Sequence, residues 1–253
     1  MKTRPGVELA SLTDVGCQRE NNEDSYAYWE PSKDADFTKL GRLAIVADGM
    51  GGHEGGQIAS RLAVETFTKA YAGATDSDPA KRLLTALKDA HRCIQERAKQ
   101  NPNLSSMGTT CTALALIDTR LYFVHVGDSR LYLLRGGKLR ILSHDHTLVA
   151  RLLEKGLVQP EHAQDHPQKH VLTSALGVPG EEMEIDARPE PLPLQKKDVL
   201  MICTDGLWGQ VRADEIEKAL ASQSPATACR SLVQIAKERG GPDNITLQVL
   251  RIN

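Results

Sequence analysis

The side chains best suited to chemistry in this sequence are acidic, and they stand at the ends of apolar segments. Three aspartates follow an apolar segment directly and a fourth precedes the last one, namely Asp48, Asp128, Asp205 and Asp243. Glu23 and Asp24 close an early polar run. One such aspartate is usually a turn residue or a helix cap. Four at the edges of apolar segments are harder to explain in that way.

Carboxylates that converge on one point repel one another and lose their hydration. The cost is on the order of several kcal/mol unless a cation binds between them. Oxygen ligands without histidine or cysteine favour Mg²⁺ or Mn²⁺ over Zn²⁺. If the strand ends converge, the acids therefore predict a site for hard divalent cations.

A glycine-rich run, residues 48–56, follows the first of these segments. It fails the dinucleotide-binding pattern because Glu54 stands where the third glycine is required, and no Gly-Lys-Ser/Thr follows for a P-loop. Glycines here instead let the backbone approach a metal closely, with the carbonyl of Gly49 available as a ligand.

The elements that must position these acids follow from apolar periodicity. Strands are predicted at 7–12, 43–47, about 183–189, about 198–204 and 245–252, with three or four more between 109 and 142 that include a hairpin at Gly136-Gly137. Helices are predicted at 55–72, from Asp78-Pro79 to Asn101-Pro102, at about 213–222 and at about 225–239, with a broken helical segment at 145–168. Strands joined by hairpins and helices in pairs favour antiparallel sheets covered by helix pairs over a parallel wound sheet.

Composition narrows the class of protein. The chain has 253 residues, 40% of them hydrophobic and 25% charged, as in ordinary globular proteins. A net charge of −2 provides no basic field for nucleic acid or anionic lipid. The apolar runs are far shorter than the ~20 residues of a membrane span, and no apolar leader follows Met1. Five widely spaced cysteines without a C-x-x-C pattern predict free thiols in a reducing compartment. We expect a soluble, cytoplasmic protein.

Taken in order, these residues resemble the metal-dependent protein serine/threonine phosphatases of type 2C, in their bacterial form. The matching motifs run along the whole chain: Thr13-Asp14-Val15-Gly16, residues 19–24, residues 46–52, Gly108-Thr109-Thr110, Gly127-Asp128-Ser129-Arg130, Asp145-His146-Thr147, Thr204-Asp205-Gly206-Leu207 and residues 240–244. The resemblance implies one α+β catalytic domain over residues 1–253. In it, two antiparallel sheets form a sandwich flanked by helix pairs, and a mobile flap at about 145–175 lies beside the active site.

The resemblance also implies a binuclear Mn²⁺ or Mg²⁺ centre. Asp48 bridges the two ions, and the carbonyl of Gly49 binds the first. Asp205 and Asp243 hold the second. Two cations ~3.5–4 Å apart lower the pKa of a bridging water and clamp both ends of an in-line displacement. Water then attacks phosphorus directly, without a covalent phosphoenzyme.

Four further residues receive roles from the resemblance. Glu23 and Asp24 act on the metals directly or through water, and Asp128 belongs to a third, weaker metal site. Arg19 matches the phosphate-binding arginine, a role that suits a planar guanidinium.

One departure concerns the acid that protonates the leaving group. Many eukaryotic members place histidine directly after Asp-Gly, but this position holds Met50, and the nearest imidazole is His53. The candidates are His53 or a water polarised at Asp128, and the second is preferred.

The predicted function is hydrolysis of phosphoserine and phosphothreonine in proteins, as a monomer opposing a serine/threonine kinase, with no nucleic-acid or membrane partner. Two alternatives stay open: a phosphohydrolase of small molecules and a non-catalytic relative that binds phosphoproteins. A non-catalytic relative would be expected to have lost some of the metal-binding carboxylates, and this sequence has all of them.

Overall fold

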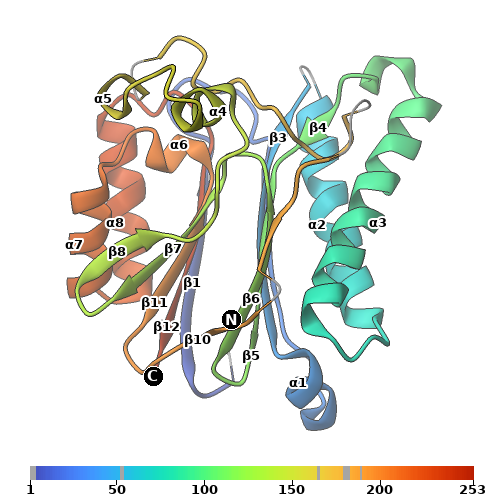
Figure 1. Cartoon of the computed structure of the whole chain (residues 1–253), viewed down its shortest axis with the longest axis vertical. Coiled ribbons are helices and arrows are strands. Elements are labelled where there is room, and N and C mark those ends of the chain that lie inside the picture. The colour runs from blue at the N-terminus through green and yellow to red at the C-terminus, as the bar shows by residue number, and fades with distance from the viewer. Residues whose placement is uncertain (1–3, 52–53, 164–165, 179–182, 189) are drawn as a thin grey trace.

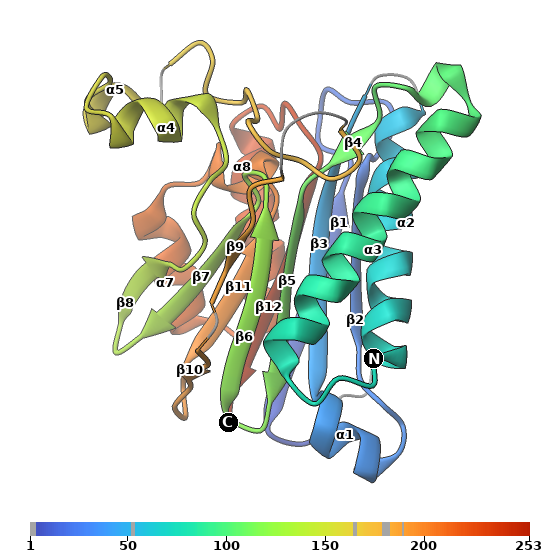
Figure 2. The same cartoon turned by 45° about the vertical axis from the view of Figure 1, so that its right-hand side comes forward.

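Two antiparallel β-sheets lie face to face, and a pair of long helices covers the outer face of each (Figures 1 and 2). The computed structural model describes residues 4–51, 54–163, 166–178, 183–188 and 190–253. The arrangement confirms the predicted α+β sandwich. In the part of the chain described, no helix combines the length and apolar character needed to cross a membrane.

The first sheet contains both terminal strands. Its order is β1 (Val7–Asp14), β12 (Ile245–Ile252), β11 (Val199–Cys203), β7 (Arg130–Arg135) and β8 (Lys138–Ile141), all antiparallel. Helices α7 (Ala213–Ser222) and α8 (Pro225–Glu238) cover its outer face. Strand β12 is buried on both sides: Ile245, Leu247 and Val249 face these helices, while Leu250 and Ile252 face the other sheet.

The second sheet is formed mainly by the N-terminal half of the chain. Its order is β10 (Leu192–Pro193), β6 (Arg120–Val126), β5 (Cys111–Ile117), β3 (Arg42–Met50) and β2 (Asp24–Trp29), with β4 (Gly108–Thr109) on β3 and β9 (Asp186–Ala187) on β6. Helices α2 (Gly55–Gly73) and α3 (Pro79–Gln100) cover it. Helix α3 begins as expected, because the Asp78 side chain accepts a hydrogen bond from the Ala80 N–H and Pro79 needs no partner there.

The remaining elements are short. They are α1 (Asp34–Leu40), the 3₁₀ helix η1 (Pro102–Leu104), α4 (Leu148–Glu154), α5 (Pro160–Ala163) and α6 (Asp205–Trp208). The predicted broken helical segment corresponds to α4 and α5, which lie at the same end of the sandwich as α6 (Figure 1). The predicted strand at about 183–189 is shorter in the structure: of residues 183–188, only Asp186–Ala187 pair with β6, and residue 189 lies outside the described part of the chain. The elements β2, α1, η1, β10 and α6 were not predicted.

One buried polar side chain connects the two sheets. Gln248 of β12 is fully buried, and its Nε2 donates to the carbonyls of Ala27 (3.0 Å) and Ile45 (2.7 Å) in β2 and β3. The Ser11 hydroxyl donates to its Oε1 at 3.3 Å. The two bonds from Nε2 run to strands of the other sheet, so they fix the position of one sheet relative to the other, whereas the Ser11 bond lies within the first sheet.

We expect the substitution Gln248→Met to lower the free energy of unfolding by about 1–3 kcal/mol, because a thioether of similar shape replaces none of these hydrogen bonds. Urea denaturation followed by circular dichroism measures the change. Gln234→Met, at an exposed position of α8, is the matched control. Equal midpoints for the two variants would show that Gln248 does not tie the sheets together.

Candidate metal centre

A polar cavity of about 530 Å³ opens at the end of the sandwich where β3 and β11 finish. Seven of the nine residues predicted for the site line it: Arg19, Glu23, Asp48, Gly49, Asp128, Asp205 and Asp243. Asp24 is not among the lining residues, and His53 lies outside the residues that the structure describes. The fold therefore brings together acids that are more than two hundred residues apart in the chain.

Each acid reaches the cavity from a different element. Asp48 lies within β3 and not beyond its end, because β3 continues to Met50 by pairing with β4. Asp128 lies where the chain passes from β6 in one sheet to β7 in the other. Asp205 is the first residue of α6, and Asp243 precedes β12. Both sheets thus contribute to the site.

Neutral hydrogen bonds hold the backbone of Asp48. Its N–H donates to the Thr110 hydroxyl (2.9 Å), and its carbonyl accepts from the Thr109 hydroxyl (2.8 Å) and the Thr110 N–H (2.9 Å). The Thr110 and Ser129 hydroxyls are 2.8 Å apart, which connects this strand to the segment that carries Asp128. The Asp48 backbone is therefore fixed, with none of these bonds using its carboxylate.

Asp24 lies on the strand next to Asp48 and does not line the cavity. The two residues are directly opposite each other in the β2–β3 pair, where like charges destabilise a sheet. Asp24 is buried, and its Oδ2 accepts a hydrogen bond from the Thr204 hydroxyl at 2.8 Å. Its Oδ1 is buried without a hydrogen-bond partner in the described part of the chain, as is Oδ1 of Asp205. Unpartnered buried carboxylate oxygens fit a place where cations or ordered water bind.

Asn244 joins the two loops that carry Glu23 and Asp243. Its Oδ1 accepts from the Glu23 N–H at 2.7 Å, and its Nδ2 donates to the carbonyls of Val15 and Asn21, both at 2.9 Å. Sequence reasoning gave Asn244 no role, although it stands directly after Asp243. We assign it the positioning of both loops.

The electrostatics of the site are those of crowded anions. Burial, followed by the charges of Asp24 and Asp205, raises the pKa of Asp48 well above its ordinary value. Burial raises the pKa of Asp24 to about 7, against opposing hydrogen bonds from Thr246 and Thr204. Burial and the charge of Asp205 also raise the pKa of Asp128. The donor set therefore fits divalent cations, which would offset this repulsion.

Sequence reasoning also missed His170. Its Nδ1 is 3.0 Å from Oδ2 of Asp205, and ligand atoms of Asp128, His170 and Asp205 lie within 4.8 Å of one another. The sequence predicted metal ligands without histidine, but beside Asp128 and Asp205 the structure adds His170 as a possible ligand. No local pattern marks His170, because only the fold brings residues 170 and 205 together.

The raised pKa of Asp48 predicts how stability depends on pH when metal is removed. A carboxyl with a raised pKa in the folded state contributes stability below its unfolded pKa, about 4, and loses that contribution as the pH rises. In EDTA at pH 7.5 we expect Asp48→Asn to melt at least about 2–4 °C above the unsubstituted protein, equivalent to ~1 kcal/mol.

Calorimetry at several pH values measures this difference, which should shrink towards pH 4. Glu65→Gln, at an exposed position of α2, should show no such trend. A lower melting temperature for Asp48→Asn in EDTA at pH 7.5 would contradict the repulsion described above.

Comparisons with known proteins identify the family of this chain. The family model described as Protein phosphatase 2C matches residues 18–239. Protein phosphatase PhpP of Streptococcus pneumoniae is 35% identical over 254 residues, covering 98% of both chains. The solved serine/threonine phosphatase of S. agalactiae is 32% identical with a TM-score of 0.88, covering 98% of this chain and 100% of that one. The catalytic domain of the phosphatase PstP, solved in complex with 2 manganese ions, is 32% identical with a TM-score of 0.82, covering 98% of each chain. The chain belongs to the protein phosphatase 2C family.

Proposed function

We propose that this protein removes phosphate from phosphoserine and phosphothreonine in other proteins, with Mn²⁺ or Mg²⁺ held by the carboxylates of the cavity. The observation that carries the proposal is the meeting of five acidic side chains and one guanidinium in a single cavity. Its relatives PhpP and PstP are named as protein phosphatases, which supports the same activity here.

The predicted metal ligands fall into two groups, one for a pair of cations and one for a third cation. Asp48, Asp205, Asp243 and the carbonyl of Gly49 would hold two cations, while Glu23 and Asp24 would act directly or through water. Asp128 would hold a third, weaker one, beside His170. When bound, such cations lower the pKa of a water and neutralise charge on the phosphoryl group. The Mn²⁺ complex of PstP supports this choice of metal.

The chain's own groups orient the substrate. The Arg19 side chain is half exposed, lines the cavity and donates to Oδ2 of Asp243 at 2.8 Å, so its guanidinium can reach phosphoryl oxygens. The Thr110 and Asn244 hydrogen bonds hold the acids in place before substrate binds. Such preorganisation reduces the reorganisation that the reaction requires.

The proposal also covers the domain organisation, the oligomeric state and the location of the protein. Residues 1–253 form one catalytic domain, because elements from both sheets and both ends of the chain line the same cavity. We propose that the protein acts as a monomer. We place the activity in the cytoplasm, opposite a serine/threonine kinase.

The proposal predicts metal-dependent hydrolysis of phosphopeptides. With Mn²⁺, phosphoserine and phosphothreonine peptides should release phosphate faster than phosphotyrosine peptides, and excess EDTA should abolish the reaction. Asp205→Asn or Asp243→Asn should lower kcat at least about 100-fold, as expected for loss of one group that stabilises charge in the active site. Glu65→Gln is the control, and malachite-green detection of phosphate is the measurement.

Full turnover in EDTA would exclude the metal mechanism. Hydrolysis of small phosphate esters without any phosphopeptide hydrolysis would favour the small-molecule alternative. Absence of turnover with every substrate, together with binding of phosphopeptides, would favour the non-catalytic alternative.

A second prediction concerns the proton for the leaving serine alkoxide, which we propose comes from water held at Asp128. Para-nitrophenolate leaves without a proton, so the loss should depend on the substrate. Asp128→Ala should lower kcat about 100-fold more for phosphopeptides than for para-nitrophenyl phosphate. His53→Ala should lower both only mildly. The reverse ranking would assign the proton donor to His53.

A further inference from the structure

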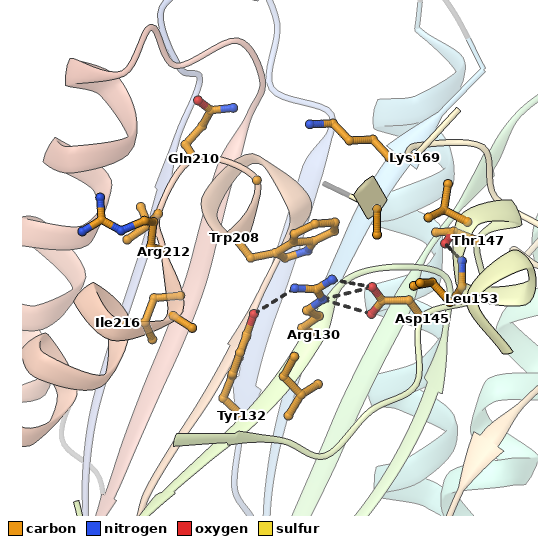
Figure 3. A pocket seen from close by; sticks show the side chains of 17 residues that line it. Arg130, Tyr132, Asp145, Thr147, Leu153, Lys169, Trp208, Gln210, Arg212 and Ile216 are labelled. Carbon is orange, nitrogen blue, oxygen red and sulfur yellow. Dashed lines mark hydrogen bonds and ion pairs between the residues drawn. The ribbon is translucent and has the colours of Figure 1, made fainter. Parts of the chain in front are cut away.

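A second cavity, of about 370 Å³, lies beside the α4–α5 segment and the start of α7 (Figure 3). We call it the side pocket. Much of its lining is apolar, and the aliphatic residues with large side chains are Ile141, Val149, Leu153, Val211 and Ile216. Its volume is at the lower end of the range of ligand sites, about 300–1,000 Å³, which is enough for one or two side chains.

Three of the residues that line the side pocket, Arg130, Asp145 and Trp208, contact one another. The guanidinium of Arg130 lies 3.6 Å from the centre of the Trp208 ring and forms hydrogen bonds with both carboxylate oxygens of Asp145 (Figure 3). Its contact with Tyr132 is longer, at 3.5 Å. Because the Asp145 carboxylate neutralises the Arg130 guanidinium, these residues give the side pocket an aromatic surface but little net charge.

The side pocket and the catalytic cavity share a wall. Three segments each give one residue to the catalytic cavity and a near neighbour to the side pocket: Asp128 and Arg130, Asp205 and Trp208, His170 and Lys169. The Trp208 Nε1–H also donates to the carbonyl of Asp128 at 2.9 Å. Adjacent residues have Cα atoms only ~3.8 Å apart, so a peptide held by its phosphate would pass the side pocket within a few residues.

The charge at the edge of the side pocket is positive. Lys169 lines it and has no side-chain hydrogen bond or ion pair within the residues that the structure describes. Arg212 also lines it but is already paired with Asp214 and Glu215. An occupant with a large apolar group and a neighbouring carboxylate would complement both the walls and Lys169.

We propose that the side pocket selects substrates by binding one apolar side chain of the phosphoprotein, about two to four residues from the phosphorylated residue. An acidic residue next to that side chain contacts Lys169. This inference rests on the proposed protein phosphatase activity and adds a preferred sequence to it.

Kinetics on a peptide panel test the preference. Each phosphothreonine peptide carries Leu or Ala at one position two to four residues before or after the phosphothreonine, followed by Glu or Lys. At one position we expect Leu→Ala to lower kcat/KM about tenfold, through KM, because an apolar side chain loses its burial. Para-nitrophenyl phosphate, which is too small to reach the side pocket, is the reference substrate.

Two variants with matched controls assign the preference to the pocket. Leu153→Ala should remove the preference for Leu, and Lys169→Glu should reverse the preference for Glu over Lys. Their controls are Leu157→Ala and Lys155→Glu, at exposed positions just after α4 that do not line the pocket. All four variants should keep the kcat for para-nitrophenyl phosphate. A preference that survives Leu153→Ala, or is lost equally in Leu157→Ala, would overturn the proposal.

Fluorescence separates this inference from the activity itself. The chain has two tryptophans, so Trp29→Phe leaves Trp208 as the only one. In that background, adding the preferred peptide without its phosphate should change the Trp208 emission. The Kd obtained from this titration should rise at least about fivefold in the Leu153→Ala variant. No change in emission would overturn the side-pocket proposal even if phosphopeptides are hydrolysed. An emission change without phosphopeptide hydrolysis would retain peptide binding and reject the proposed activity.

Discussion

Repulsion between buried carboxylates is the constraint on which the rest of this structure depends. Asp24 and Asp48 stand opposite each other in adjacent strands, and Asp128 and Asp205 approach them from other elements. Arg19 is the only lysine or arginine among the described residues that line the cavity. Neutral groups such as the Thr110 and Thr204 hydroxyls make most of the hydrogen bonds around the acids. The fold thus positions these anions without neutralising them, which weakens the folded chain and prepares it to bind cations.

The site also depends on the packing of one sheet against the other. Asp24 and Asp48 belong to the second sheet, whereas Thr204 and Asp205 follow a strand of the first. The Thr204–Asp24 hydrogen bond crosses between the sheets beside the cavity, and Gln248 crosses between them in the core. Distances between the acids are therefore set by contacts that the local sequence around each acid does not reveal.

Much of the architecture was predictable because its signals are local. Helices α2, α3, α7 and α8 carry clear apolar periodicity, and the Gly136-Gly137 turn has positive φ at both residues. Strand β2 was missed because its two tyrosines and one tryptophan do not alternate cleanly with polar residues. Helix α1 has only seven residues and buries none of them, so its sequence is too short to show a helical apolar repeat.

The acids of the site were predictable as residue types at the ends of apolar segments, but their partners were not. Nothing near Asn244 or His170 in the sequence indicates the residues that they contact. These contacts join segments far apart in the chain and arise only from tertiary packing. The position of Asp24 behind the cavity, and not on its surface, likewise depends on the pairing of β2 with β3.

The passage from β6 to β7 has a consequence for how this chain can diverge. Only residues 127–129 separate the two strands, and they change sheets while carrying Asp128 to the cavity. Gly127 adopts φ +106°, and a Cβ there would lie 2.5 Å from the Thr110 side chain. An insertion or a larger residue would displace both the acid and the sheets. The hairpin turn at the far end of β7 and Gly156 after α4 have open space around them, so we expect lengthening there to leave the acids in place, and substrate preference can change while the hydrolytic chemistry stays constant.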